Sequence, residues 1–173
     1  LLLTGCGAEQ AMKKGDKFYA LGEYYDAAEQ YKKAFRQTPA KDRDVRGVRS
    51  LKMAECYRRI NSTPRAIAAY RNAIRFHKTD SLTYFHLGQQ LMRIGSYKEA
   101  EKVFQTAIDS GVNERQARIG LRSAKLAPQW KNAGSAYTVK RATLFNSRRA
   151  DYSPMLAGDE YNTLYFTSTR NQT

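Results

Sequence analysis

The chain has no long apolar run and only two cysteines. These shortages argue against a transmembrane protein and against a fold held together by several disulfides. Its longest opening run, Leu1–Leu3, is far short of the roughly 20 apolar residues of a transmembrane helix, and no membrane span is predicted after Cys6. Its only other cysteine is Cys56, which is expected to be a small buried side chain in a packed helix. At most one disulfide is possible, and none if Cys6 is modified. The hydrophobic share of 42% is enough for a packed core.

Catalytic and metal-binding motifs are also missing. The sequence has no nucleophile–base pair, no glycine-rich phosphate loop and no cluster with metal-ligand spacing. The two histidines, His77 and His86, are expected on neighbouring helices, without cysteine, aspartate or glutamate at ligand spacing. Surface or packing roles are therefore favoured over metal binding. No cofactor is predicted, and the chain is predicted not to be an enzyme.

Positive charge is in large excess. The chain has 30 lysines and arginines against 16 acidic residues, a net charge of +14. Such a charge fits acidic partners, nucleic acid among them. The basic residues are spread along the whole chain, however, and no RNA-binding motif accompanies them. A basic helical surface that prefers acidic partners is therefore favoured over nucleic-acid binding.

The opening sequence LLLTGC resembles the end of a secretory signal peptide. An apolar run followed by small residues is typical of the cleavage region, and Leu3-Thr4-Gly5-Cys6 resembles a bacterial lipobox. The resemblance implies a signal-peptide remnant at residues 1–5, lipid attachment at Cys6 and a lipid-anchored N-terminus at residues 6–8. Two or more acyl chains hold a protein on a membrane far more firmly than one. The alternative is a frayed N-terminus with a free thiol.

Three segments of the chain share one pattern. ALGEYYDAAEQYKKAF, RINSTPRAIAAYRNAI and RIGSYKEAEKVFQTAI each carry a turn residue, an alanine five residues later, an aromatic four later and another alanine three after that. Spacings of four and three place the last three on one face of a helix. The residues are Gly22, Ala27, Tyr31 and Ala34 in the first segment, Asn61, Ala66, Tyr70 and Ala73 in the second, and Gly95, Ala100, Phe104 and Ala107 in the third.

A partner helix is expected before each of these helices. Gly15, Ala54 and Gly88 each lie twelve residues before the first alanine of the pattern. Small residues on both helices let the backbones approach closely, while the aromatic rings fill the remaining space. The residues predicted to make this packing are Gly15, Ala27, Tyr31, Ala54, Ala66, Tyr70, Gly88, Ala100 and Phe104. They predict three antiparallel helix pairs.

The period of the pattern resembles that of tetratricopeptide repeats, which is about 34 residues. Ala54 and Gly88 are one such period apart, and Gly15 and Ala54 are separated by the same period plus five residues. The five extra residues are expected in a loop within residues 39–47, which have a loop-like composition. In the second repeat Asn61 replaces the usual turn glycine, so a less regular turn is expected there.

The resemblance implies a mainly α fold, a helical solenoid over residues 9–112. Its repeats are expected at about 9–40, 47–79 and 81–112. A fourth repeat would need a small residue where Arg122 stands, so residues 113–127 are predicted to form one capping helix that ends before Pro128 and covers the open end of the stack. A solenoid of this kind has no catalytic centre, and its concave face is expected to bind a peptide or a partner protein.

The composition changes after Pro128. The alternating stretch AYTVKRATLF, residues 136–145, predicts a strand, and Thr163–Ser168 predicts a second strand after a turn-rich segment. The segment resembles one blade of a bacterial PD40-type propeller, a resemblance that assigns Asp151, Pro154, Asp159 and Arg170 to its turn. One blade cannot bury its own faces. Residues 128–173 are therefore expected to be a linker and the first strands of a β-propeller; the alternative is a β-hairpin that packs on the solenoid.

The order of lipobox, repeats and propeller strands resembles a family of outer-membrane lipoproteins that end in an OmpA-like domain, among them a component of the type IX secretion system. The resemblance implies a non-enzymatic scaffold that faces the periplasm. Acyl chains on Cys6 would hold it on the outer membrane, and a domain absent from this chain would bind peptidoglycan. The repeats would then dock protein partners of a cell-envelope secretion complex. The alternatives are a periplasmic peptide-binding or chaperone module for exported proteins and a basic solenoid without lipid that binds RNA or acidic protein.

Overall fold

Seven helices are followed by two strands in the part of the chain that the structure describes. The computed structural model describes residues 3–80, 82–111, 113–134, 137–138 and 140–170, and of residues 3–6 only the backbone. The elements are α1 (Leu3–Ala20), α2 (Tyr24–Gln37), α3 (Arg43–Arg59), α4 (Thr63–Arg75), α5 (Thr83–Arg93), α6 (Tyr97–Asp109), α7 (Glu114–Asn132), β1 (Asp151–Ala157) and β2 (Thr163–Ser168). The chain divides into two units, Leu1–Ala133 and Gly134–Thr173.

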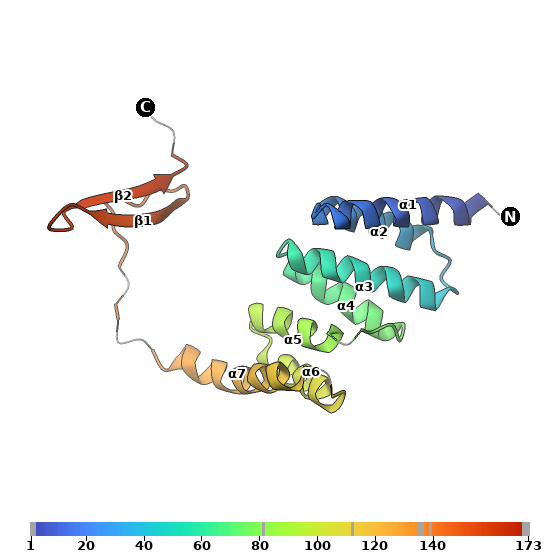
Figure 1. The fold of residues 1–173 in the computed structure, drawn as a ribbon. Helices are drawn as coiled ribbons and strands as arrows, with labels where there is room; N and C mark the ends of the chain where they lie inside the picture. The colour runs from blue at the N-terminus through green and yellow to red at the C-terminus, as the bar shows by residue number, and fades with distance from the viewer. Residues whose placement is uncertain (1–2, 81, 112, 135–136, 139, 171–173) are drawn as a thin grey trace. The chain divides into compact units, whose positions relative to one another are not determined.

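The helices of the first unit form three hairpins and a final single helix (Figure 1). α1 packs on α2, α3 on α4 and α5 on α6, and the hairpins stack because α2 also contacts α3 and α4 contacts α5. α7 packs on α6 and reaches α5. Among the helices of the described residues, none combines the length and apolar character needed to cross a membrane.

The turn inside each hairpin ends its first helix in the same way. Gly22, Asn61 and Gly95 have φ angles of 79°, 57° and 75°, in the left-handed region. In each turn the next backbone N–H donates to the carbonyl five residues earlier, at 2.9, 2.9 and 3.0 Å, a common helix C-terminal motif. The expectation of a less regular turn at Asn61 is wrong, because asparagine enters the left-handed region more easily than most residues with a side chain.

The extra residues between the first two repeats lengthen a helix rather than a loop. A loop over residues 39–47 is wrong for the second half of that segment, because α3 already begins at Arg43. The first turn of α3 is held by Arg46, whose Nη1 donates to the Thr38 carbonyl at 2.9 Å. The same guanidinium lies 4.1 Å from the centre of the Phe35 ring. These contacts with α2 and its C-terminus stabilise helix in a segment whose composition favours a loop.

The last helix of the first unit is longer than the sequence predicts. A helix over 113–127 that ends before Pro128 is wrong at its C-terminal end, because α7 continues through Pro128 to Asn132. Proline removes one helical hydrogen bond, but its fixed φ is itself helical, so the backbone can continue at that cost. Ala117 and Ala124 are fully buried, which places their face of α7 against the stack.

The second unit contains an antiparallel hairpin of β1 and β2, with Asp151 opposite Ser168. β2 occupies the residues predicted for the second strand. The prediction of a strand over 136–145 is wrong for the described residues of that segment, since none of them belongs to a strand. A strand needs a hydrogen-bonded neighbour. The short connection at 158–162 makes DYSPMLA, and not the earlier segment, the neighbour of β2.

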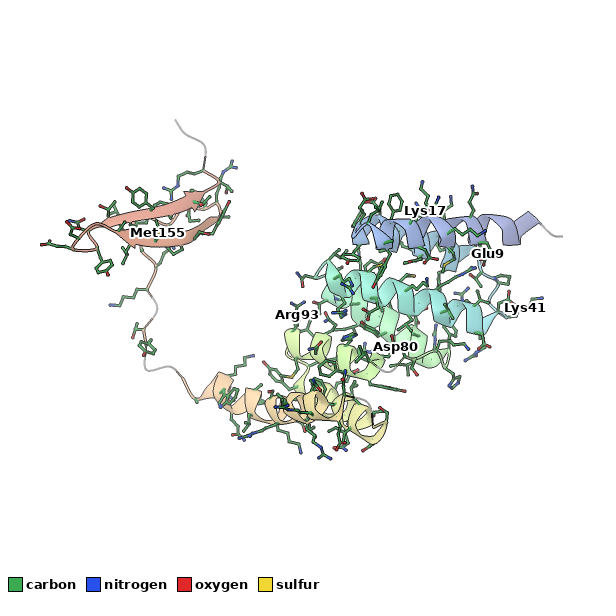
Figure 2. The ribbon with its side chains drawn as sticks, in the orientation of Figure 1. Glu9, Lys17, Lys41, Asp80, Arg93 and Met155 are labelled. Atoms are coloured by element: carbon green, nitrogen blue, oxygen red, sulfur yellow. The ribbon has the colours of Figure 1, made fainter. Side chains whose placement is uncertain are left out.

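Both faces of the hairpin leave apolar side chains exposed. Met155, labelled on β1 in Figure 2, and its neighbour Leu156 are 60% and 58% exposed. Successive side chains of a strand point to opposite faces of the sheet, so neither face is covered within the described part of this unit. A single two-stranded hairpin is marginally stable in water by itself.

The core of the first unit depends on rings that lie against positions without a side chain. Tyr31 and Phe104 are at most 1% exposed. A Cβ added at Gly15 would lie 2.6 Å from the Tyr31 ring. Phe104 is confined from two sides, because a Cβ added at Gly88 or at Gly120 would lie 2.7 or 2.6 Å from its ring. The separation of the helices is therefore set by these ring contacts.

We expect Gly88→Ala to destabilise the helical unit. Overpacking costs about 1–3 kcal/mol, more than the about 1 kcal/mol that alanine gains over glycine inside a helix, because Gly120 prevents Phe104 from moving away. The free energy of unfolding, measured by urea denaturation, should fall by about 1–2 kcal/mol.

Gly7→Ala in α1 is the matched control for this substitution. A Cβ at Gly7 would make ordinary contacts with the Gln37 side chain at 3.6 Å, so the stability should stay the same or rise slightly. Equal stability of the Gly88→Ala and wild-type proteins would show that the ring is not confined.

Candidate functional site

The first two repeats each place a carboxylate against a buried tyrosine. The Tyr31 hydroxyl donates to Asp16 Oδ1 at 2.7 Å, and the Tyr70 hydroxyl donates to Glu55 Oε1. In both pairs the carboxylate comes from the first helix of the hairpin and the tyrosine, 15 residues later, from the second. The pairing supplies the one hydrogen-bond partner that each buried ring needs.

Each of these carboxylates also contacts the following hairpin. Lys52 Nζ donates to Asp16 Oδ1 at 2.5 Å, and His86 Nδ1 lies 3.0 Å from Glu55 Oε1. Lys52 and His86 are one repeat period apart, so they occupy equivalent places in successive repeats. We call this set of contacts across α1, α3 and α5 the polar ladder.

Glu55 is the best-connected member of the polar ladder. Burial by itself raises the pKa of a carboxyl, but hydrogen bonds with His86, Arg58 and Tyr70 lower the pKa of Glu55 to about 2. Arg58 Nη2 donates to Glu55 Oε2 at 2.7 Å. Burial, together with the charge of Glu55, raises the pKa of Tyr70, so its hydroxyl stays a donor. A charged carboxylate therefore joins α3, α4 and α5 at neutral pH.

The polar ladder stops in the third repeat. Phe104 stands where the first two repeats have tyrosine, and Gln89 stands where they have a carboxylate. Gly120 follows His86 by one repeat period, so α7 has no side chain at the equivalent place. A hollow of about 270 Å³ lies here between α5, α6 and α7. This phenylalanine hollow is lined by Phe85, Gln89, Met92, Phe104, Gln116, Ile119, Gly120 and Ser123.

A second hollow, of about 340 Å³, lies between the C-terminal ends of α3 and α5. This arginine hollow is lined by Arg58, Arg59, Asn61, Gln89, Gln90 and Arg93, and Figure 2 shows Arg93 at the end of α5. Arg58 is neutralised by Glu55. Arg59 and Arg93 form no ion pair with any carboxylate of the described residues. The hollow is therefore a cationic site with two charges that no described acidic group balances.

Gln90 is a buried polar side chain whose amide oxygen lacks a hydrogen-bond partner among the described residues. It is 3% exposed and lines the arginine hollow, and its Oε1 has no hydrogen-bond partner among the described residues. Leaving a buried acceptor unpaired costs about 1–3 kcal/mol. An apolar residue at this place would avoid that cost.

Comparisons with known proteins identify the fold of the helical unit. No family model and no curated protein matches the chain. The C-terminal TPR-containing domain of an FK506-binding protein from Plasmodium falciparum superposes with a TM-score of 0.65 at 18% identity, over 76% of this chain and 94% of that one. The chain has the tetratricopeptide-repeat fold. Domains of this fold are generally protein-interaction modules rather than catalytic domains.

Two further structures with the tetratricopeptide-repeat fold contain a bound peptide. The first TPR domain of Spaghetti (RPAP3), bound to the HSP90 peptide SRMEEVD, has a TM-score of 0.59 at 21% identity, over 72% of this chain and 95% of that one. The second TPR domain of human RPAP3, in complex with the HSP70 peptide SGPTIEEVD, has a TM-score of 0.56 at 20% identity, over 71% of this chain and 96% of that one. At these identities the likeness concerns the fold alone.

The packing residues predicted from the sequence lie in the core of the tetratricopeptide-repeat domain. All nine are buried. They are Gly15, Ala27, Tyr31, Ala54, Ala66, Tyr70, Gly88, Ala100 and Phe104. They set the distances between helices, and in this way they position the two hollows without lining the arginine hollow themselves.

The sequence prediction missed the residues of the arginine hollow. Arg59 and Arg93 are one repeat period apart, so their equivalence in successive repeats was a usable signal. The matching spacing of Glu55 to Tyr70 and of Asp16 to Tyr31 was a second one. Gln90 had no such signal, because burial of a single glutamine without a partner depends on how α3 and α5 pack.

The cysteines and histidines singled out in the sequence can be compared with their predicted positions. Cys56 is fully buried, and burial raises the pKa of its thiol to about 12. His77 is not on a helix as predicted, because it lies in the turn after α4 with a φ of 55°. No group of three or more potential metal ligands occurs among the residues with described placement. The side chain of Cys6, the predicted lipid-attachment residue, lies outside the described residues.

Two of the residues assigned to a propeller-like turn lie together. Arg170 Nη2 lies 2.9 Å from Asp151 Oδ1, and hydrogen bonds, the strongest from Ser168, lower the pKa of Asp151. Pro154 lies in β1 at an irregularity of the pairing between the strands. Asp159 is exposed in the connection between the strands. Asp151 and Arg170 therefore join the start of β1 to the segment after β2, at the open end of the hairpin. Pro154 and Asp159 do not take part in that contact.

We expect acid to weaken the contact between the second and third repeats through Glu55. Its pKa is about 2 in the folded protein, against an ordinary value of 4.5. The folded-state pKa is lowered, so the stabilisation is present above pH 4.5 and is lost as the pH falls towards 2. A shift of this size corresponds to about 3 kcal/mol. Urea denaturation of the wild-type and Glu55→Gln proteins should show a difference of this order at pH 7 and little difference near pH 2.

Glu114→Gln serves as the control for this pH dependence. Glu114 pairs with Arg118 on the exposed surface of α7, with its side chain 51% exposed. Such a pair contributes about 0.5 kcal/mol or less, so the stability should hardly change at any pH. A Glu55→Gln protein with the wild-type pH profile would show that Glu55 is not the group responsible.

Proposed function

We propose that this protein is a non-enzymatic scaffold of a bacterial cell envelope, in which a lipid on Cys6 holds a protein-docking module on the outer membrane, facing the periplasm. The docking module is the tetratricopeptide-repeat domain. The observation that carries the protein-docking part of the proposal is the arginine hollow, a cationic recess on a fold whose domains are generally protein-interaction modules. It supports acidic protein segments as partners.

The lipid anchor is supported by the sequence LLLTGC and is compatible with the packing of α1. The first buried side chain that the structure describes in α1 is Ala8, at 4% exposed, followed by Ala11. Removal of the residues before Cys6 would therefore leave the described packing face of α1 in place. An acylated Cys6 would lie directly before that face, and the membrane affinity of its chains does not depend on the rest of the fold.

The proposed partners are the proteins of a cell-envelope secretion complex, such as the type IX secretion system. We further propose that the β1–β2 hairpin begins a propeller, since its two exposed apolar faces favour further strands as neighbours. Binding to peptidoglycan would need a further domain. These parts of the proposal rest on the resemblance in the order of motifs.

A periplasmic peptide-binding or chaperone module is the second candidate. Two solved structures of the same fold hold a peptide, which favours a peptide ligand here as well. Stoichiometric co-purification with one partner would support the scaffold. Weak binding to many exported peptides would support the chaperone. The third candidate, a basic solenoid without lipid that binds RNA, predicts an affinity for RNA that falls steeply with added salt.

The lipid anchor can be tested by mass spectrometry of the N-terminal peptide from native membranes. We expect a peptide that begins at Cys6 and carries two or three acyl chains. Cys6→Ser should abolish the modification and release the protein from membranes, whereas Cys56→Ser, which changes a buried thiol, should leave both unchanged. An unmodified peptide that still contains residues 1–5 would refute the envelope proposal.

A further inference from the structure

Two of the three arginines of the arginine hollow, Arg59 and Arg93, are held in place by neutral groups. The Arg59 guanidinium lies 4.9 Å from the ring centre of Tyr24 and donates to the Tyr24 hydroxyl at 3.3 Å. Arg93 Nη1 donates to Asn61 Oδ1 at 2.7 Å. Each contact uses one of the five N–H donors of a guanidinium. The two side chains are therefore oriented without being neutralised by a described acidic group, which is the arrangement needed to bind an incoming carboxylate.

Gln90 adds a requirement that an isolated anion does not meet. Its buried Oε1 accepts hydrogen bonds and has no donor among the described residues. A phosphate group offers acceptors only, and the donors of an RNA strand lie on its ribose hydroxyls and bases. An extended peptide, by contrast, offers a backbone N–H donor at every residue beside its acidic side chains. Two arginines beside an amide oxygen that has no donor among the described residues therefore fit an acidic peptide better than the phosphate groups of a nucleic acid or of a membrane surface.

The phenylalanine hollow lies next to the arginine hollow, because Gln89 lines both. Its walls include Phe85, Met92 and Phe104, with Ile119 of α7 largely exposed at 59%. Its volume of about 270 Å³ offers an apolar side chain a place out of water. A ligand that spans both hollows thus needs an acidic and an apolar residue close together in its sequence.

We propose that the two hollows together bind one extended segment of a partner protein. An aspartate or glutamate side chain of the segment lies between Arg59 and Arg93, its backbone pairs with the amide of Gln90, and a neighbouring apolar side chain enters the phenylalanine hollow. The segment need not be a chain end, because the recognised charge is on a side chain. This inference rests on the protein-docking part of the proposed function and not on the lipid anchor.

The first experiment measures the binding of a fluorescent hexapeptide to the full chain by anisotropy. The peptide contains three glutamates and one leucine and is blocked at both ends, and its counterpart has glutamine in place of each glutamate. We expect the acidic peptide to bind at least about tenfold more tightly at low salt. Equal affinities would overturn the proposal. So would tighter binding of the glutamine peptide with a free C-terminal carboxylate, because the charge would then come from a chain end.

The second experiment replaces the two arginines. The Arg59→Gln, Arg93→Gln double variant should lose at least about tenfold in affinity for the acidic peptide. The matched control is the Arg36→Gln, Arg115→Gln double variant, which removes the same net charge from exposed residues of α2 and α7 and should keep the affinity within about twofold. Equal losses in both variants would reduce the effect to net charge and overturn the site.

Gln90→Met separates a ligand-binding role from a structural one. Methionine has a similar length without polar hydrogen-bonding groups, so the variant should melt a few degrees higher, because it removes a buried unpaired acceptor. It should also bind the acidic peptide several-fold more weakly. A less stable variant would show that the amide supports the fold, and an unchanged affinity would show that Gln90 does not contact the peptide. Either result would overturn this part of the proposal.

A twelve-nucleotide uridine RNA tests the competing class of ligand. We expect it to bind the full chain weakly, with the arginine double variant and its control affected alike. RNA binding that exceeds that of the peptide and depends on Arg59 and Arg93 would overturn the proposal. Because all these measurements use protein without lipid, a failure here leaves the lipid test of Cys6 unaffected, and failure of the lipid test leaves the peptide site intact.

Discussion

The rest of the helical unit depends on one steric relation, an aromatic ring of each second helix that packs on a residue with little or no side chain in the first. Where that residue is glycine, as at Gly15 and Gly88, even a methyl group would overlap the ring of Tyr31 or Phe104. The helices are consequently held at a fixed distance. Repeating this contact with nearly constant spacing brings the same positions of successive first helices side by side, and the surface between α3 and α5 follows from it.

Polar contacts elaborate this packing differently in each repeat. Where the ring is a tyrosine, its hydroxyl donates a hydrogen bond to a carboxylate, and the carboxylate then binds a lysine or histidine of the next repeat, as Glu55 does with His86. Phe104 has no hydroxyl and needs no acceptor, and Gln89 and Gly120 take the equivalent places. The chain therefore closes its surface with a charged network in two repeats and leaves it open in the third. The candidate binding site lies where the polar ladder ends.

Errors in the sequence-based fold prediction occur where long-range contacts decide local structure. The charged segment before Gly47 has a loop-like composition but is helical, because Arg46 reaches the Thr38 carbonyl and the Phe35 ring. The alternating stretch after Pro128 has strand character, but its described residues lie outside the strands, since β2 pairs with the segment closer to it. In each case a local preference worth a fraction of a kcal/mol per residue was outweighed by contacts that sequence spacing does not reveal.

The sequence by itself determined the repeat, its period and its packing residues, because small and aromatic residues at helical spacing record a steric fit within one hairpin. It also indicated the turn positions Gly22, Asn61 and Gly95, although the turn at Asn61 is as regular as the other two. Only the tertiary structure decided the site. The stacking of α5 on α4 brings together Arg59, Arg93 and the Gln90 oxygen that has no partner among the described residues. Whether a charge or a buried polar atom has a partner depends on which side chains surround it in the folded protein, and residue spacing in the sequence does not predict this.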